Sequence, residues 1–132
     1  MAEIRGYRQR VGRSGEEDAV RYLKQKGYRI LARNFRTEDG EIDAVAEDGD
    51  VLVFVEVKTN VRGGFGEPED RVDLKKQVRI GRVAMGYLQA EGLEDVDCRF
   101  DVVTVTRTRG RTAIRHIEDA FWLDANQTER GF

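Results

Sequence analysis

The spacing of apolar residues along the chain predicts seven elements in the order α-β-β-β-α-β-β. Apolar positions three or four residues apart indicate amphipathic helices, whereas alternating or continuous apolar runs indicate strands. An Asp-Gly turn at Gly49, between two such runs, predicts a hairpin. The predicted helices cover about residues 14–26 and 73–90, and the predicted strands cover about residues 28–35, 40–46, 51–58, 98–105 and 112–117.

Local signals set the ends of the two predicted helices. Ser14 is a good N-cap, and Glu17 follows three residues later as in a capping box, so we expect the first helix to begin here. Gly27 supplies its C-cap. Asp73 is the expected N-cap of the second helix, which would connect two parallel strands. The pattern therefore predicts an α/β fold in which helices flank a mixed β-sheet.

Two charges interrupt the strand predicted over residues 51–58. Its first five residues are apolar, as in a strand that is covered on both faces, but Glu56 and Lys58 follow on either side of Val57. Side chains alternate along a strand, so Glu56 and Lys58 share a face. Buried charge costs several kcal/mol unless it is paired or binds a ligand. The end of this strand is therefore a candidate site.

A third charged residue joins this pair across the predicted hairpin. Folding about the turn places Asp43, in the Gly40-Glu41-Ile42-Asp43 segment, near Val55 and Glu56. Two acids and a lysine at strand ends are typical of a site for a hard metal ion and a phosphodiester. The alternative is a structural ion pair between Glu56 and Lys58, with Asp43 as a turn residue.

Length and composition are those of one domain. The chain has 132 residues, 39% apolar and 36% charged, so we expect a single domain over residues 1–132. Its core would span about residues 14–118, between a flexible N-terminal segment and a C-terminal tail. No apolar stretch approaches the roughly 20 residues that cross a bilayer, which predicts no membrane association. The single Cys98 suits a reducing cytosol, so we expect a cytoplasmic protein.

The net charge of −2 conceals a segregation of charge along the chain. Arginine and lysine dominate residues 4–13, 19–37 and 99–115, whereas acids crowd residues 38–50 and 91–97. This pattern fits either a basic face for nucleic acid beside an acidic pocket, or ordinary solvated surfaces. A glycine-rich loop over residues 59–72 is either a flap over a substrate or a tolerated insertion.

An ordered set of motifs resembles one known family. The chain looks like the YraN-type family of uncharacterised bacterial proteins, and more widely like the PD-(D/E)xK, or restriction-endonuclease-like, superfamily and its Holliday-junction resolvases. Ile42 stands where the superfamily's proline would precede Asp43. The residues that carry the resemblance are Gly15-Glu16, Ala19, Tyr22-Leu23, Gly27-Tyr28, Asn34-Phe35-Arg36, Gly40-Glu41-Ile42-Asp43, Val53-Phe54-Val55-Glu56-Val57-Lys58, Phe65-Gly66, Lys76-Gln77, Ala84, Tyr87-Leu88 and Arg99-Phe100-Asp101-Val102-Val103.

The resemblance implies a restriction-endonuclease-like fold and roles for the matching residues. Asp43 and Glu56 would bind Mg²⁺ or Mn²⁺, Lys58 would act on the attacking water or the phosphate, and Glu16 would assist from the first helix. Contacts to nucleic acid are expected from five further residues: Lys76, Gln77, Arg36, Arg109 and Arg111.

The sequence thus leaves two hypotheses of different class. The first is a metal-dependent endonuclease that acts on DNA, branched or single-stranded, in preference to RNA. The alternative is a non-catalytic nucleic-acid-binding or assembly module that retains a nuclease-like site. Whether the protein forms a homodimer stays open.

Overall fold

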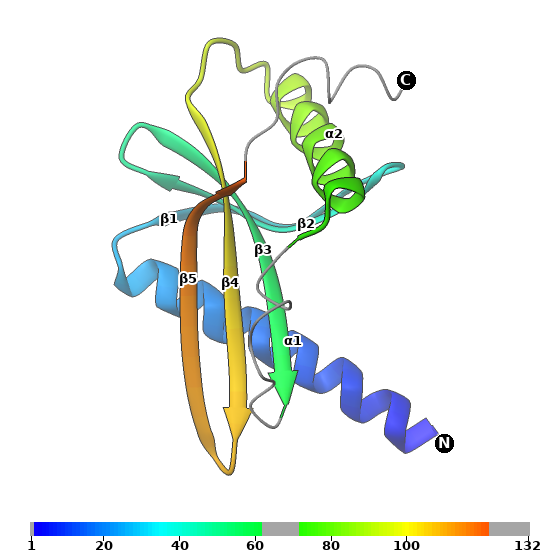
Figure 1. Ribbon diagram of the computed structural model, residues 1–132. Coiled ribbons are helices and arrows are strands. Elements are labelled where there is room, and N and C mark those ends of the chain that lie inside the picture. Colours follow the sequence, from blue (N-terminus) through cyan, green and yellow to red (C-terminus); the bar gives the residue numbers. More distant parts are fainter. Residues whose placement is uncertain (1, 62–71, 122–132) are drawn as a thin grey trace.

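The fold has seven elements in the predicted order (Figure 1). The structure, a computed structural model, describes the backbone of residues 2–61 and 72–121 and the side chains of residues 14–60 and 72–121. No helix among the described residues is long and apolar enough to cross a membrane. The elements are α1 (Ala2–Gln25), β1 (Arg29–Thr37), β2 (Gly40–Asp48), β3 (Val51–Val61), α2 (Leu74–Ala90), β4 (Cys98–Thr108) and β5 (Arg111–Phe121).

The five strands form one mixed sheet in the order β1-β2-β3-β4-β5. Neighbouring strands are antiparallel except β3 and β4, which are parallel and are connected through α2. The predicted hairpin is confirmed, since Asp48 pairs with Val51 around a turn in which Gly49 has a φ of +60°. A parallel pair inside an otherwise antiparallel sheet confirms the predicted α/β architecture.

The two helices cover opposite faces of the sheet and make two separate cores (Figure 1). Successive residues of β3 alternate between them, so this strand is buried on both faces as predicted. The α2 core includes Ile42, Val45, Leu52, Phe54, Ile80, Val83, Ala84, Tyr87 and Val102, and the α1 core includes Ala19, Leu23, Ala44, Ala46, Val53, Val55, Val103 and Val105.

The predicted start of the first helix at Ser14 is wrong, because α1 begins at Ala2. Ser14 and Gly15 therefore lie inside a continuous helix. A methyl group added at Gly15 would lie 2.2 Å from the Thr59 hydroxyl oxygen, so glycine lets α1 cross β3 closely. The Ser-Gly pair marks a helix–sheet crossing, which a local sequence pattern cannot distinguish from a cap.

Several element ends also differ from the predictions. β3 continues to Val61, three residues past its predicted end, and the rest of the predicted loop, residues 62–71, lies outside the described residues together with the tail from residue 122. β5 continues to Phe121, which is 9% exposed and belongs to the α2 core. Leu74, the first residue of α2, is 58% exposed.

The close crossing of α1 and β3 gives a stability prediction. Gly15→Ala should destabilise the protein by about 1–3 kcal/mol, because the new methyl group overpacks the contact with Thr59. Adding Thr59→Ala should restore part of this loss. Ser14→Ala should change stability by less than about 0.5 kcal/mol, since Ser14 is not a cap. Urea denaturation measures all four proteins, and a loss of about 1 kcal/mol for Ser14→Ala would instead support the cap.

Candidate functional site

The site begins where the β2–β3 ladder ends. Ala44 pairs with Val55 in the last backbone pair, and Asp43 immediately precedes Ala44 in β2. Its carboxylate oxygen Oδ2 accepts a hydrogen bond from the Val57 backbone nitrogen at 2.7 Å. The Asp43 side chain thus binds a β3 amide just beyond the last backbone pair, and this bond fixes the carboxylate against the middle of β3.

An irregularity in β1 accompanies this position. Arg33 pairs with Ala44 and Phe35 pairs with Ile42, so Asn34 lies across from Asp43. Asn34 has a φ of +53°, a left-handed conformation that asparagine tolerates better than most residues. Ile42 and Ala44 also pack into different cores, although residues two apart in a regular strand share a face. The regular alternation of β2 side chains between the two faces of the sheet is therefore broken at Asp43, which lies between Ile42 in the α2 core and Ala44 in the α1 core.

Glu56 and Lys76 bring opposite charges to the same place from different elements. Glu56 follows Leu52 and Phe54 on the α2 face of β3, and its side chain is 13% exposed. Lys76 Nζ lies 3.4 Å from Glu56 Oε1. Asp73 caps α2 by accepting a hydrogen bond from the Lys76 backbone nitrogen at 2.8 Å, which confirms the predicted cap and fixes the turn that carries this lysine.

Acidic groups repel one another at this site. The pKa of Asp43 is raised to about 7, chiefly because burial disfavours the carboxylate and also because Glu56 lies beside it, whereas the Val57 N–H opposes the rise. The pKa of Glu16 is also raised, first by burial and then by the charges of Asp43 and Glu41. Glu16 on α1 therefore lies within the electrostatic influence of Asp43. A bound cation would relieve the repulsion between these acids.

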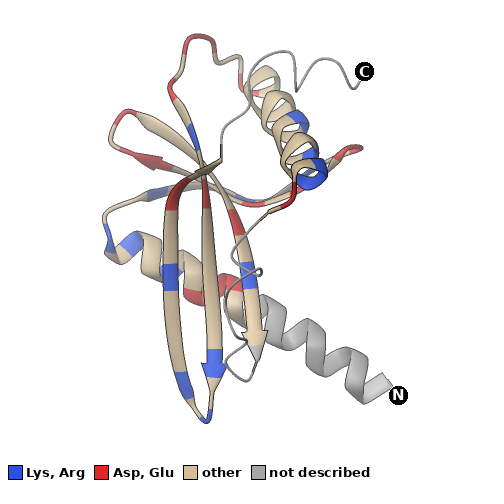
Figure 2. Ribbon diagram, in the orientation of Figure 1, with Lys and Arg blue, Asp and Glu red and all other residues tan. Residues whose placement is uncertain are grey.

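The structure places the remaining predicted residues in different surroundings. Lys58 is half-buried, two residues beyond Glu56 on the same face of β3. The Gln77 side-chain amide donates to the Val72 carbonyl at 2.6 Å, which stabilises the N-terminal end of α2. Arg36 pairs with Glu41 at 2.5 Å on the surface. Arg109 and Arg111 lie exposed at the β4–β5 turn, apart from the acid pair, where basic residues gather (Figure 2).

A second buried polar cluster lies under the α1 face and was not predicted from the sequence. Asp101, 1% exposed, accepts hydrogen bonds from Arg99 at 2.9 Å, from His116 Nε2 at 2.7 Å and from the Asp119 backbone nitrogen at 3.0 Å. Lys26 Nζ lies 2.9 Å from His116 Nδ1. An ammonium only donates, so Nδ1 accepts and Nε2 carries the proton that binds Asp101. Arg99 also donates to the Tyr28 hydroxyl at 2.6 Å and to Asp48 at 3.0 Å.

This second cluster is a neutralised structural centre. The pKa of Asp101 is lowered because the hydrogen bonds from His116, Arg99 and Asp119 outweigh its burial. The bond to Asp119, whose φ is +54°, spans the register shift between β4 and β5. The sequence signal was slight: Arg99 and Asp101 share a face of the strand, but their partner His116 lies on the next strand.

Comparison with known proteins places the chain among bacterial relatives. Residues 15–105 match the model of the uncharacterised protein family UPF0102. A UPF0102 protein of Alkaliphilus oremlandii is 48% identical over 114 residues, 85% of this chain and 97% of the relative. One from Symbiobacterium thermophilum is 50% identical over 113 residues, 85% of this chain and 96% of the relative. The matched region contains both the acid pair and Asp101.

The raised pKa of Asp43 predicts how stability responds to pH without metal. The folded protein holds a proton on Asp43 that the unfolded chain, with a pKa of 3.8, releases earlier. Stability should therefore fall as pH rises from about 4 to 7, by on the order of 1–4 kcal/mol. Asp43→Asn should lack this decline and be the more stable protein at pH 8 in EDTA. Urea titrations at several pH values measure the difference, and a lower stability for Asp43→Asn at pH 8 would contradict it.

The Asp101 cluster predicts the opposite behaviour. Asp101→Asn should cost about 3–5 kcal/mol at neutral pH, because Arg99 then lacks its buried counter-charge. The lowered pKa of Asp101 stabilises the fold above the unfolded value of 3.8, and this contribution is lost on acidification. The two proteins should therefore converge in stability at acid pH. An equal difference at pH 7 and at pH 3 would contradict a charge-based role.

Proposed function

Because this chain belongs to the UPF0102 family, whose name carries no activity, we propose its function from the site itself: metal-dependent hydrolysis of phosphodiester bonds in DNA. The observation that carries the proposal is the meeting of Asp43 and Glu56 where the pairing of β2 with β3 stops, with Lys76 3.4 Å from Glu56. The two acids repel each other, and this repulsion contributes to the raised pKa of Asp43. Repulsion of this kind favours a site that takes up a cation.

The donor set suits Mg²⁺ or Mn²⁺. Asp43 and Glu56 offer hard carboxylate oxygens, which these ions prefer to nitrogen or sulfur ligands. Among the described residues there is no cluster of three or more His, Cys, Asp or Glu side chains suited to holding a metal ion. A two-carboxylate site matches Mg²⁺, which is usually held by one or two carboxylates, with water and substrate phosphate as the other ligands. Bound in this way, the ion would supply polarisation of the phosphate and a more acidic water.

The chain's own residues prepare the site for a phosphate. The Val57 N–H donates to one oxygen of Asp43 and so fixes this carboxylate beside Glu56. Lys76 offsets the charge of Glu56, so that an anionic phosphate can approach two carboxylates. Lys58, on the same face, would orient the attacking water or balance charge that develops on the phosphate. Glu16 would help to hold that water from α1.

The resemblance to nucleases and the basic segments favour DNA over a small phosphodiester. Basic residues gather at the β4–β5 turn and along the first half of α2 (Figure 2). We expect Arg36, Arg109, Arg111 and Gln77 to contribute to backbone binding, in a protein of the cytoplasm. Contacts of this kind position a polynucleotide without reading its sequence.

One experiment tests the site and the reaction together. We expect wild type with Mn²⁺ to cleave at least one of four labelled substrates: single-stranded, duplex, flapped or four-way DNA. Glu56→Gln and Asp43→Asn should each reduce the rate about 100-fold or more, which corresponds to about 3 kcal/mol of transition-state stabilisation. Glu47→Gln, which removes a surface acid from the same strand as Asp43, is the matched control and should cleave normally.

Calorimetry separates loss of metal from loss of chemistry. Mn²⁺ should bind wild type and Glu47→Gln, and the Asp43→Asn, Glu56→Gln double variant should not bind it at the same concentration. Binding by the double variant that equals wild type would remove the assignment of these ligands. Normal cleavage by Glu56→Gln would remove the proposed reaction.

A further inference from the structure

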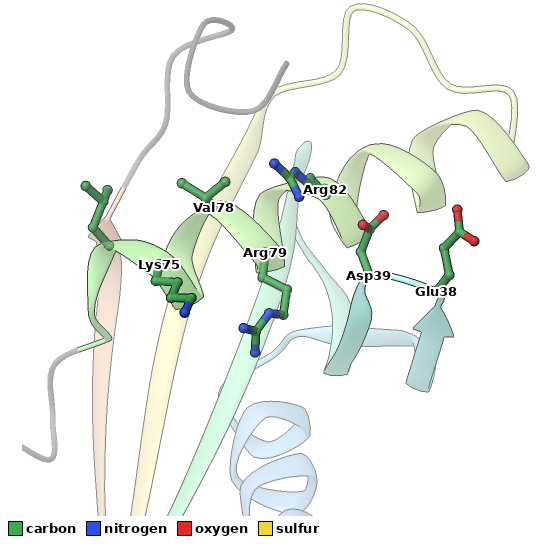
Figure 3. Close-up of a pocket in the computed structure, with 7 residues that line it drawn as sticks. Glu38, Asp39, Lys75, Val78, Arg79 and Arg82 are labelled. Carbon is green, nitrogen blue, oxygen red and sulfur yellow. The ribbon is translucent and has the colours of Figure 1, made fainter. Parts of the chain in front are cut away.

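A groove of about 620 Å³ separates the first half of α2 from the β1–β2 turn (Figure 3). Its two walls carry opposite charges. Basic side chains project from α2, acidic side chains project from the turn, and two apolar side chains of α2 also line it. The lining residues are Lys75, Arg79 and Arg82, then Glu38 and Asp39, and finally Leu74 and Val78.

The basic wall follows from helical spacing. Residues 75, 79 and 82 are four and three apart, so they share one face of α2 over about 10 Å. The first turn of α2 contains no acid, and Lys75 and Lys76 both lie at its positive end. Cations at a helix N-terminus are unfavourable unless an anion is near. Glu56 is that anion for Lys76, and the exposed Lys75 faces the groove.

Two glycines let the helix and the turn approach each other. Gly40 has a φ of +148°, and a methyl group there would lie 3.2 Å from Arg79 Cδ. The stem of Arg79 therefore lies over bare backbone at the start of β2. A methyl group at Gly86, further along α2, would lie 3.2 Å from the Thr37 methyl group. On the opposite wall, the Asp39 backbone nitrogen donates to the Thr37 hydroxyl at 3.1 Å, which fixes the turn.

Both walls lead to the acid pair. On α2, Lys75 is followed by Lys76, whose ammonium contacts Glu56. On β2, Asp39 precedes Asp43 by four residues, about 13 Å of extended strand. A chain that occupied the groove would therefore reach the proposed metal site without leaving the surface of the protein.

We propose that this groove holds a single-stranded segment of DNA beside the scissile phosphate, and that it sets the substrate class of the nuclease; this inference rests on the proposed function. Phosphates contact the basic wall, which extends over about 10 Å of α2. Base faces lie on Leu74, which is 58% exposed, and on Val78. Exocyclic amino groups of the bases donate to Glu38 and Asp39.

The acidic wall is what distinguishes single strands from duplex. In a duplex the Watson–Crick edges are paired, so they cannot enter the groove and bind the carboxylates. A second strand would also bring its phosphates toward Glu38 and Asp39, and like charges repel. The basic wall gives affinity for any DNA strand, whereas the acidic wall gives the preference for single-stranded over duplex DNA.

Fluorescence anisotropy in EDTA tests the groove, since no metal is present and cleavage plays no part. Wild type should bind a labelled single-stranded 12-mer about tenfold more tightly than the matching duplex. Lys75→Gln with Arg79→Gln should weaken single-strand binding about 10–100-fold and reduce the slope of log K against log salt by about 1.4, or about 0.7 for each phosphate that is no longer neutralised. Arg21→Gln with Lys24→Gln removes the same charge from α1 and is the control.

A second pair of substitutions tests the acidic wall. Glu38→Gln with Asp39→Asn should raise duplex affinity more than single-strand affinity, and should reduce the tenfold preference to about twofold or less. The proposal is overturned if wild type binds duplex as tightly as single strand, or if the α1 control lowers the salt slope as much as the groove pair. Because binding is measured without metal, a wild type that binds single strands in this way but cleaves nothing would refute the proposed function alone.

Discussion

The site depends on the hydrogen bond from the Val57 amide to the Asp43 carboxylate. It lies where the β2–β3 ladder stops at the Ala44–Val55 pair, so the same register that aligns the hairpin also fixes the carboxylate. A shift of one residue would turn the side chains of β3 to the other face and move Glu56 away from Asp43. Because Leu52 and Phe54 are buried in the α2 core, such a shift is strongly disfavoured. Hydrophobic burial in one half of the strand thus determines the position of charges in the other half.

The two helices then deliver the remaining groups, and close packing sets their distance. Gly15 lets α1 cross β3 at Thr59, next to Lys58, and this places the neighbouring Glu16 within the field of Asp43. Gly40 lets the stem of Arg79 lie over the start of β2. Interiors pack densely, so a methyl group at Gly15 would force a shift at Thr59, and one at Gly40 would strain the backbone and press on the Arg79 stem. These glycines therefore belong to the geometry of the site, although neither bears a reactive group.

The sequence predicted the parts of the fold that rest on local signals. The continuous apolar run over residues 51–55, the turn at Gly49 and the cap at Asp73 are each read within a few residues, and each is confirmed. The predicted start of α1 was wrong because Ser14-Gly15 has the composition of a helix cap, whereas in the structure it lies inside α1 where the helix crosses β3. The ends of β3 and β5 were placed too early, since long strands gain residues from pairing with their neighbours rather than from their own hydrophobicity. Lys76 was expected to contact nucleic acid. Its contact with Glu56 depends on how α2 packs against the sheet, which no local sequence pattern shows.

The acid pair and the Asp101 cluster, both among the described residues, differ in a way that bears on function. Asp101 is enclosed, but Arg99, His116 and the Asp119 amide all donate to it, and its pKa falls. Asp43 also bonds to a backbone amide, yet a second acid lies beside it and its pKa rises to about 7. The chain can therefore neutralise a buried carboxylate fully, and does so one strand away from β3. Placing Asp43 beside a second acid reduces the stability of the isolated fold at neutral pH, and such a cost is typical of a site whose compensating charge comes from a ligand.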